Sequence, residues 1–248
     1  MADSIPNERR PWSVPDRPWA MEQKWHDLLF MHWPVKAAAI RSLIPSRLEI
    51  DLYDGMAWIG VVPFRMSGVR ARGTPPVPGI SAFPELNVRT YVRSQGKPGV
   101  WFFSLDAASV LAVAAARLWF HLPYFRAQMS LKHAREGGVA YYSHRVHRGA
   151  PCADLRVDYA PTGKIFEAAL GTIDYFLCER YCLYAAHGAR VYRGEIHHAP
   201  WPLEPAEAQI AVNTMAAAAG IELPDTKPLL HFARYQSVRV WLLEKVQD

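Results

Sequence analysis

One predicted strand carries two charged side chains on the same face. The stretch 83–92, FPELNVRTYV, alternates apolar and polar residues, and successive side chains of a strand point to opposite faces. Glu85, Asn87, Arg89 and Tyr91 therefore share one face. That face either meets solvent or lines a cavity. In a cavity, we expect Glu85 and Arg89 to lie within reach of one another and of an oxyanion or carbonyl ligand.

A third charged side chain lies in an apolar segment. Arg117 interrupts the apolar run from Val110 to Phe120. A lone charge among apolar residues either pairs with a carboxylate or contributes to a binding site. Asp106 and Glu85 are the carboxylates that we consider as partners for a structural ion pair.

Other polar residues in apolar surroundings favour structural roles. Glu179 and Arg180 interrupt the run 176–184, where we expect a buried ion pair. His197 and His198 lie side by side on a predicted strand and so point to opposite faces, which does not make a two-histidine metal site. No histidine spacing favours zinc, so we expect no metal, and the role of these two histidines stays open.

Composition and charge indicate a globular protein. Of the 248 residues, 50% are hydrophobic and 12% aromatic, which is enough for a sizeable core. The net charge is +5, but the arginines are scattered and form no run that would follow a phosphate backbone, so we expect no nucleic-acid partner. The apolar segment 110–120 is too short to cross a bilayer, so we expect no membrane partner either.

Cysteine usage and the missing motifs narrow the class further. Cys152, Cys178 and Cys182 form no disulfide framework and favour free thiols in a reducing, cytoplasmic compartment. The chain contains no G-x-S-x-G, G-x-G-x-x-G or Walker pattern, so the usual support for a hydrolase or a nucleotide site is missing. We expect no cofactor.

The chain divides into an arm and one domain. Residues 1–20 contain four prolines among arginines and tryptophans and predict an extended arm. Trp12 and Trp19 would hold this arm on the body or on a partner chain, which leaves a homo-oligomer open. Residues 21–248 predict a single α+β domain in which many strands surround one buried helix in a barrel-like sheet.

The expected elements follow from apolar periodicity and turn residues. Residues 20–33 fit a strand or a helix, and the Asp54-Gly55 turn predicts a hairpin of strands 48–52 and 56–64. We expect further strands at 83–92, 100–105 and about 229–243, strands or mixed segments at 124–131, 139–146, 155–159, 173–185 and 189–197, and helices at 35–43, 107–118 and 205–220.

Several segments resemble the YqjF-like family of uncharacterised bacterial proteins. They lie within about residues 21–205 and read LLFMHWPV, LIPSRLEIDLYDGMAWIGVVPFRMSGVR, FPELNVRTYV, GVWFFSLDA, ARLWFHLPYF, ERYCLY and IHHAPWPL. On these segments the chain is identified as a member of that family. The family is remotely similar to acetoacetate decarboxylase. This resemblance implies an acetoacetate decarboxylase-like fold: a cone-shaped β-barrel with an enclosed apolar cavity and a few flanking helices.

The remote resemblance can be followed in register. Residues 37–51, AAAIRSLIPSRLEID, resemble that enzyme's helix, proline stop and following strand, and Glu85 falls where the enzyme has a cavity glutamate. Residues 116–125, ARLWFHLPYF, resemble its segment G-R-E-x-x-x-x-P-K-K. Arg117 and the proline match, but Tyr124 and Phe125 replace the two lysines.

This replacement decides the expected chemistry. Acetoacetate decarboxylase forms a Schiff base through a lysine with a depressed pKa. Tyr124 and Phe125 cannot form one, and Lys132, the next lysine along the chain, lies in a polar stretch that predicts a turn. We therefore expect that the protein is not a Schiff-base decarboxylase.

The residues and the resemblance together predict a ligand-binding cavity for a small carbonyl or carboxylate compound. If the protein is an enzyme, it is lyase-like or an acid–base catalyst, with Glu85 as the general acid or base and an arginine holding the substrate oxyanion. The expected ligand-binding residues are Arg89, Arg117, Tyr91, His121 and Tyr124.

Two alternatives stay open at this stage. In the first, the barrel is a non-enzymatic receptacle for an apolar or aromatic small molecule, and Glu85 and Arg89 are simply paired. In the second, the arm and the APWPL segment at 199–203 mediate assembly of a scaffold.

Overall fold

The computed structural model describes residues 8–78, 81–109, 113, 120–134 and 137–247. Long strands form where apolar residues alternate with polar ones or continue without a break, as β-branched and aromatic residues favour. The strands are β1 Met21–Val35, β2 Glu49–Ile50, β3 Ala57–Ala71, β4 Phe83–Ser94, β5 Lys97–Ala107, β6 Tyr124–His133, β7 Val139–Arg145, β8 Asp154–Pro161, β9 Cys182–His187, β10 Arg190–His197, β11 Glu204–Asn213, β12 Leu229–Val240 and β13 Glu244–Lys245. The short helices are α1 Ala37–Ile40, η1 Arg41–Leu43, α3 Ile173–Cys178 and η3 Ala217–Ala219.

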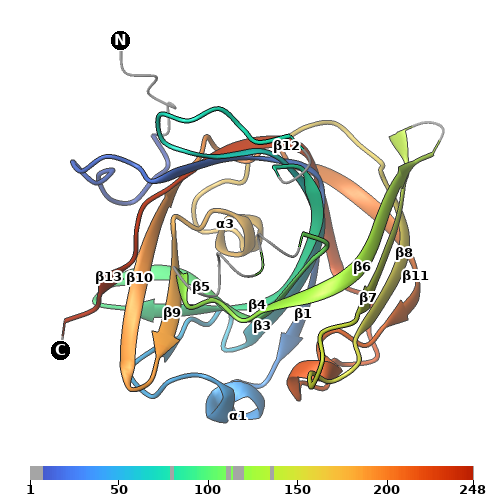
Figure 1. Ribbon diagram of the computed structural model, residues 1–248. Coiled ribbons are helices and arrows are strands. Elements are labelled where there is room, and N and C mark those ends of the chain that lie inside the picture. The colour runs from blue at the N-terminus through green and yellow to red at the C-terminus, as the bar shows by residue number, and fades with distance from the viewer. Residues whose placement is uncertain (1–7, 79–80, 110–112, 114–119, 135–136, 248) are drawn as a thin grey trace.

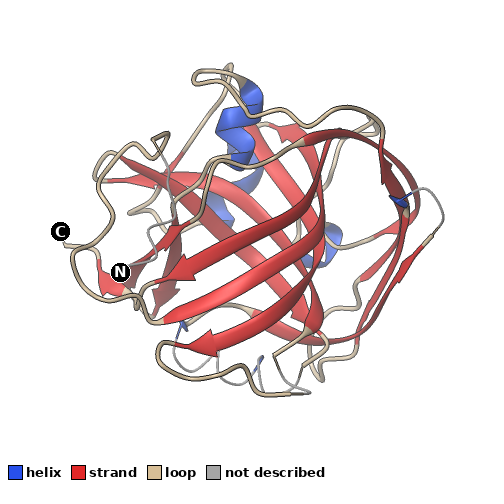
Figure 2. Ribbon diagram, turned by 90° about the horizontal axis from the view of Figure 1, so that it is seen from above, coloured by secondary structure: helices blue, strands red, loops and turns tan. Residues whose placement is uncertain are grey.

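The strands close into a barrel (Figure 1). Hydrogen-bonded neighbours follow the order β5-β6-β7-β8-β11-β12-β1-β3-β4, and β4 pairs again with β5, so nine strands form a closed ring. β9 and β10 make a second connection, from β5 to β12. The strands cross the wall obliquely in Figure 2, as closure of a barrel requires.

The central strands β1, β3 and β4 have buried side chains on both faces. Phe30 and Phe64 belong to an apolar cluster on one side of these strands. Leu29, Val88 and Tyr141 belong to a second cluster on the other side, to which β7 and β8 also contribute. Because neither face meets water, β1 and β3 contain continuous apolar runs at 28–31 and 57–64, while most polar side chains of β4 are buried.

Helix α3 lies inside the ring of strands in Figure 1. It begins after Thr172, whose Oγ1 accepts a hydrogen bond from the backbone N–H of Tyr175 at 3.3 Å, an ordinary N-cap. Its last turn is buried, and the carbonyl oxygen of Leu177 accepts hydrogen bonds from the side chains of Arg89 and Tyr91. The helix thus closes one end of the space that β4 lines.

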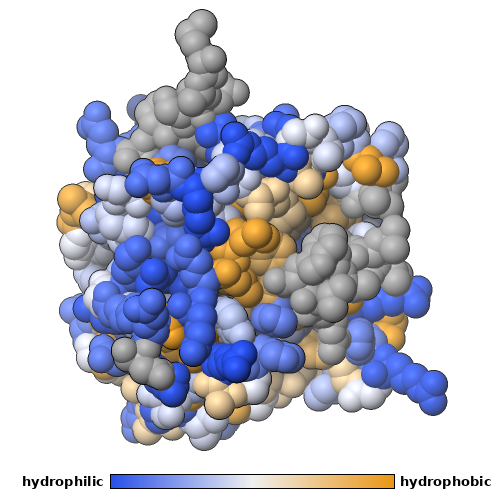
Figure 3. Space-filling model, turned by 60° about the vertical axis from the view of Figure 1, so that its left-hand side comes forward, coloured by the Kyte–Doolittle hydropathy of each residue, from blue (hydrophilic) through white to orange (hydrophobic). Residues whose placement is uncertain are grey.

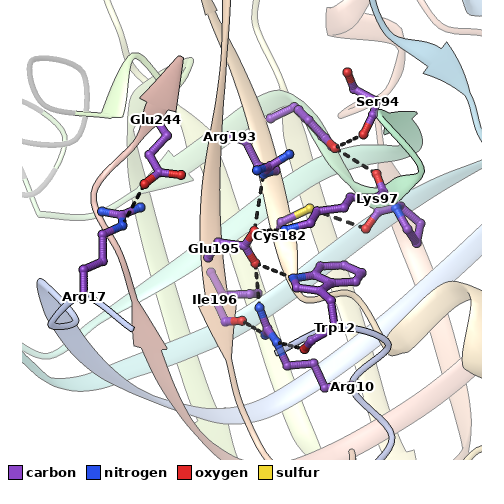
Figure 4. A network of polar contacts seen from close by, with 12 residues as sticks. Arg10, Trp12, Arg17, Ser94, Lys97, Cys182, Arg193, Glu195, Ile196 and Glu244 are labelled. Atoms are coloured by element: carbon purple, nitrogen blue, oxygen red, sulfur yellow. Dashed lines mark hydrogen bonds and ion pairs between the residues drawn. The ribbon is translucent and has the colours of Figure 1, made fainter. Parts of the chain in front are cut away.

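The described part of the N-terminal arm is fixed onto the barrel (Figure 4). Arg10 Nη2 and Trp12 Nε1 donate to the same oxygen of Glu195, at 2.6 and 2.7 Å. Lys97 Nζ and Arg193 Nε lie 3.1 and 3.3 Å from its other oxygen. A buried carboxylate needs such partners, so this cluster holds the arm on the body, the first of the two roles expected for Trp12.

The outer surface is mostly polar where the arm and β10 lie. Figure 3, in which the side of the molecule with β10 and β13 is turned forward, shows hydrophilic side chains around one central apolar area. Among the residues that the structure describes, no helix has the length and apolarity to cross a membrane.

The helix expected at 205–220 is wrong. Residues 204–213 form β11, and only a short 3₁₀ turn follows at η3. Glu207 and Gln209 are exposed while Ala206, Ala208 and Ile210 pack inward, which is the two-residue period of a strand. The alanines favour a helix in isolation, but pairing with β8 and the apolar face override that preference.

The expected hairpin at 48–64 is only partly right. Asp54 and Gly55 form the turn, with positive φ values of 49° and 75°. The pairing across it stops at a single bridge between Tyr53 and Met56. β2 pairs with β4, whereas β3 pairs with β1 and β4, because the long apolar β3 is needed in the centre of the sheet.

Two other expectations have different outcomes. Residues 173–185 combine α3 with the start of β9, which fits the expected mixed segment. In the segment 107–118, Ala107 ends β5, and most of the expected buried helix lies outside the described residues. The strand alternative at 20–33 is confirmed as β1.

Candidate functional site

A cavity of about 620 Å³ is enclosed by the central strands β1, β3 and β4 together with β10, β12 and α3. Its wall is mainly apolar and aromatic, with Trp25, Phe30, Phe64 and Phe102 among the lining side chains. This volume falls within the range of small-molecule sites, which are largely apolar with a few placed polar groups. The polar or charged lining residues are Gln23, Arg70, Thr74, Glu85, Asn87, Arg89, Tyr124, Cys178, Arg180, Cys182 and His198.

Strand β4 supplies a row of three polar side chains to this wall. Glu85, Asn87 and Arg89 all line the cavity, as their shared face predicts. They stand opposite Phe64, Val62 and Gly60 of β3 in an unbroken antiparallel register. At the usual rise per residue of a strand, the Cα atoms of Glu85 and Arg89 are about 13 Å apart.

Glu85 is a buried carboxyl group with one hydrogen-bond partner. Its side chain is 2% exposed, and the Tyr124 hydroxyl donates to Oε2 at 2.8 Å. Burial raises the pKa of Glu85 to about 8, and this effect outweighs the Tyr124 hydrogen bond, which lowers it. Tyr141 holds the same residue in place by donating to its backbone carbonyl at 2.7 Å. Near neutral pH, Glu85 is therefore mostly protonated.

Arg89 lies at the same cavity and is not paired with Glu85. Its Nη2 donates to the Leu177 carbonyl at 3.2 Å and to the Tyr91 hydroxyl at 3.3 Å. Its charge lies over the Phe30 ring, 5.3 Å from the centroid. Among the described residues no carboxylate forms an ion pair with it, and its buried Nε has no hydrogen-bond partner. A buried cation in this state can recognise an anion.

A set of side chains behind Arg89 fixes its position. The Tyr91 hydroxyl donates to Leu177 at 2.7 Å and lies 2.6 Å from Nε2 of fully buried His32. Since the one hydroxyl hydrogen goes to Leu177, Nε2 carries the imidazole hydrogen and donates to Tyr91. Burial lowers the pKa of His32 well below its ordinary value, and the Arg89 charge adds to this effect. His32 is thus a neutral support.

Gly60 makes room for this arrangement. A Cβ atom built on Gly60 would lie 3.1 Å from the His32 ring and 3.2 Å from Cγ of Arg89. Both distances are tighter than ordinary packing. Only glycine leaves His32 and Arg89 where they are.

Asn87 lies between the two charged residues of the row. It is 5% exposed, and its buried Oδ1 has no hydrogen-bond partner among the residues that the structure describes. Buried polar atoms are nearly always satisfied, so an orphan oxygen on a cavity wall points to a ligand or solvent partner. The sequence placed Asn87 on the correct face but offered no signal that its amide lacks a partner.

Two more cavity residues were not expected from the sequence. Arg180 pairs with Asp51 at 2.6 Å, and Asp51 also binds Arg93 at 2.8 Å. The expected buried ion pair is thus confirmed for Arg180, whereas Glu179 accepts hydrogen bonds from the Tyr181 hydroxyl and the backbone N–H of Trp201.

His198 is the second of these residues. Its ring stacks on Tyr181, with the centroids 4.7 Å apart. Its two ring nitrogens lie 2.7 and 3.1 Å from the carbonyl oxygens of Ala199 and Arg180. Burial lowers its pKa, while Glu179 and the two carbonyls act in the opposite direction. His198 lines the cavity and His197 does not. Two adjacent histidines in a sequence do not show which of them faces a cavity.

The structure brings some of the expected site residues together and not others. Glu85, Arg89 and Tyr124 line one cavity, and Tyr91 lies directly behind Arg89. His121 lies elsewhere: its ring stacks on His187 at 4.5 Å and borders a separate, smaller hollow.

The expected ion pairs of Arg117 have a different outcome. Arg117 itself lies outside the described residues. Asp106, one of its two considered partners, forms a bidentate pair with Arg145, with both contacts at 2.7 Å.

The two positions that match the decarboxylase lysines have different surroundings. Tyr124 faces the cavity and binds Glu85, whereas Phe125 packs under the Arg145 charge, which is 4.2 Å from its ring centroid. Of the described residues that line the cavity, none is a lysine. Lys132 is exposed on β6, which corrects the turn expected there.

Comparison with solved structures places the fold. An acetoacetate decarboxylase-like enzyme from Sphingomonas wittichii RW1 matches with a TM-score of 0.63 over 94% of this chain and 95% of its own, at 11% identity. The enduracididine biosynthesis enzyme MppR, solved in complex with pyruvate, matches with a TM-score of 0.64 over 99% of both chains, at 10% identity. At such identities the likeness shows the fold alone. The expected acetoacetate decarboxylase-like barrel is confirmed.

Sequence comparison gives the family. The uncharacterised protein YqjF of Bacillus subtilis (strain 168) is 49% identical over 234 residues, which cover 94% of this chain and 95% of that protein. The model of DUF2071, described as an uncharacterised conserved protein, matches residues 22–237. This barrel, with Glu85, Asn87 and Arg89 in one row on its cavity wall, thus belongs to the DUF2071 family of YqjF-like proteins.

Proposed function

We propose that this protein binds a small carbonyl or carboxylate compound in the barrel cavity and acts on it as an acid–base catalyst without a Schiff-base lysine. The observation that carries the proposal is that Glu85 and Arg89 line the same apolar cavity, where burial raises the pKa of Glu85 to about 8. A carboxylic acid that keeps its proton near neutral pH can donate to a substrate carbonyl. Glu85 is thus the general acid, and Arg89 holds the anionic group of the compound.

Tyr124 sets the direction in which Glu85 donates. Because the Tyr124 hydroxyl donates to Oε2, the carboxyl proton of neutral Glu85 resides on Oε1. That proton is then available to a ligand oxygen. Deprotonated Glu85 keeps the Tyr124 hydrogen bond and takes a proton from the carbon next to the protonated carbonyl, which leaves the enol and protonated Glu85. The reverse steps return the enol to the ketone, so solvent deuterium enters at that carbon once Glu85 has exchanged its own proton with solvent.

The cavity wall also supports a mechanism without a covalent lysine. The residues that replace the decarboxylase lysines are a tyrosine that binds Glu85 and a phenylalanine that packs against Arg145. Neither forms a Schiff base. The structurally similar enzyme MppR was solved in complex with pyruvate, a small carbonyl acid.

The second candidate function is non-enzymatic binding of an apolar or aromatic small molecule. The aromatic side chains that dominate the wall favour it. It differs from the first candidate in one respect only, which is that Glu85 transfers no proton to the ligand.

Proton exchange separates the two candidates. The purified protein is incubated in D₂O with a panel of oxo acids whose ketone stands at increasing distances from the carboxylate, and loss of the protons next to the ketone is followed by NMR. We expect exchange of at least one compound above the protein-free rate. Glu85→Gln should reduce this exchange by about a hundredfold, the typical contribution of a positioned acid or base.

Two controls complete the experiment. Glu207→Gln changes an exposed carboxylate on β11 and should leave the exchange rate unchanged. If the oxo acids bind but exchange at the protein-free rate, or if Glu85→Gln exchanges as fast as the unmodified protein, the catalytic proposal is wrong. Binding without exchange would establish the second candidate.

A further inference from the structure

The polar row on β4 follows the depth of the cavity. The chain enters β4 from the loop 72–82, and the exposed loop residues Thr74, Pro75 and Val77 line the cavity at that end. Along β4 from this end, Phe83 comes first, Glu85 second and Arg89 last. Arg89 is six positions beyond Phe83, so its Cα atom lies about 20 Å along the strand from that of Phe83 at the mouth end.

The deep end of the cavity is closed and cationic. Arg89 is bonded there to the last turn of α3, whose Leu177 and Cys178 are buried. Arg180 lines the same end and shares Asp51 with Arg93, so one carboxylate serves two arginines. Within the described part of the chain, the buried Nη2 of Arg180 and the buried Nε of Arg89 have no hydrogen-bond partner.

The walls between the deep end and the mouth are apolar. Val62, Phe64 and Met66 of β3 follow one another along the cavity beside β4. At the mouth, Val77 and Leu242 are 53% and 56% exposed although both line the cavity. A compound that fills this space has a long apolar body, and its end can reach solvent.

We propose that the ligands of this cavity are carboxylates with an extended apolar chain, bound head first, with the carboxylate at Arg89 and the chain directed toward the mouth. This inference rests on the proposed function, because it uses the same cavity. It adds the chemical class of the ligand and the direction in which the ligand lies. A short oxo acid would leave most of the cavity unfilled.

This orientation assigns different parts of the ligand to the three polar residues. Arg89 binds the carboxylate through its guanidinium group, whose Nε lacks a partner among the described residues. Glu85 stands about 13 Å along the strand from Arg89, so it meets the chain several bonds away from the carboxylate. Asn87 lies between them, where its free Oδ1 accepts a hydrogen bond from a polar substituent on the chain.

Isothermal titration calorimetry with simple acids tests the proposal. The probes are hexanoate, octanoate, decanoate and dodecanoate, together with 1-decanol, which has the same chain as decanoate but no charge. We expect affinity to rise with chain length and decanoate to bind more tightly than decanol. Arg89→Met should weaken decanoate binding by about ten- to a hundredfold and leave decanol binding unchanged.

Control variants separate a lost charge from a damaged fold. Arg126→Met removes an exposed arginine on β6 and should not change decanoate affinity. Arg89→Lys keeps a charge but loses the planar fork, and should bind decanoate with intermediate affinity. Thermal unfolding of each variant shows whether it is folded.

The result that overturns the proposal is equal affinity for decanoate and decanol, or decanoate binding that survives Arg89→Met. Chain-length-independent binding would also contradict it. None of these probes carries a ketone, so the titration does not depend on proton transfer. Failure of the exchange experiment with success of this one would reject only the catalytic role of Glu85.

Discussion

At the scale of single residues, the environment of Glu85 explains its acidity. A carboxylate loses its hydration when it is buried among apolar side chains, and one hydrogen bond from Tyr124 does not replace that hydration. Protonation removes the charge. The same burial leaves Arg89 charged, since a guanidinium group keeps its proton in proteins. Two residues of one strand, about 13 Å apart, therefore face the cavity as a neutral acid and a cation.

The raised pKa of Glu85 predicts that the protein loses stability as the pH rises. Between the ordinary value of 4.5 and about 8, the folded state keeps a proton that the unfolded state has lost. The free energy of unfolding then falls with pH across this window, by on the order of 4 kcal/mol. Below about pH 4.5 the contribution is fully present, and above about pH 8 it is gone. Urea unfolding at pH 5 and pH 8 measures the change.

Glu85→Gln is the matched reference for this prediction. Glutamine has nearly the shape of the protonated acid, keeps an oxygen for the Tyr124 hydrogen bond and does not titrate. The unmodified protein should lose more stability than the variant between the two pH values, because all other titrating groups are shared. An identical pH dependence of both proteins would show that Glu85 is ionised in the fold.

At the scale of elements, the pairing of β3 with β4 determines what the cavity can bind. Gly60 stands opposite Arg89, and the space above it is occupied by the His32 ring and the Arg89 stem. The neutral His32 holds Tyr91, and Tyr91 with α3 holds the guanidinium group. Three elements thus fix one cation.

Gly60→Ala should disturb this cation. The new methyl group has to displace the His32 ring or the Arg89 side chain by a few tenths of an ångström. We expect decanoate affinity to fall by about tenfold and the free energy of unfolding by about 1–2 kcal/mol, as for other overpacked sites. Calorimetric titration and urea unfolding give the two numbers.

Gly55→Ala serves as the comparison for Gly60→Ala. Gly55 has a φ of 75°, so alanine there is strained, but nothing lies within 4 Å of its added Cβ atom. This variant should lose stability and keep its decanoate affinity. Equal loss of affinity in both variants would mean that Gly60 has no special relation to Arg89.

The elements were predictable where a strand has one pattern throughout. Alternation along 83–92 gave β4 and the shared face of Glu85, Asn87 and Arg89 correctly. The same rule applied to 204–213 would have given β11, but its alanines suggested a helix. Glu85 and Arg89 were expected to lie within reach of one another, but they are not paired, because four residues of a strand span about 13 Å.

The parts of the site that come from distant segments could not be predicted. His32, Gly60 and Leu177 surround Arg89 only after β1, β3 and α3 have packed together. The pairing of Arg180 with Asp51 joins residues 129 positions apart. Local periodicity carries no information on such contacts.

At the scale of the whole molecule, the fold buries both faces of β1, β3 and β4. One face meets the cluster that surrounds the cavity, and the other meets the cluster that includes β7 and β8. Packing against the second cluster supports β1, β3 and β4 from one side, while their other face encloses the cavity. The N-terminal arm adds to this support, since Arg10 and Trp12 hold β10 through Glu195.

The barrel itself was anticipated from the resemblance to acetoacetate decarboxylase and is confirmed by the solved structures that it matches. Strand patterns alone predicted a barrel-like sheet but gave neither the strand order nor the second connection through β9 and β10. That order depends on pairings between strands far apart in the sequence, such as β1 with β12. The closure of the sheet into a barrel was therefore predicted from the family resemblance, because local sequence patterns do not show which strands pair.

A crystal structure of the protein with decanoate tests the central claim most directly. We predict that the carboxylate lies within hydrogen-bond distance of Arg89 at the closed end, and that the chain runs along the apolar wall of β3 toward Glu85 and the mouth. A cavity that stays free of decanoate at saturating concentration, or decanoate bound with its carboxylate at the mouth, would contradict the account.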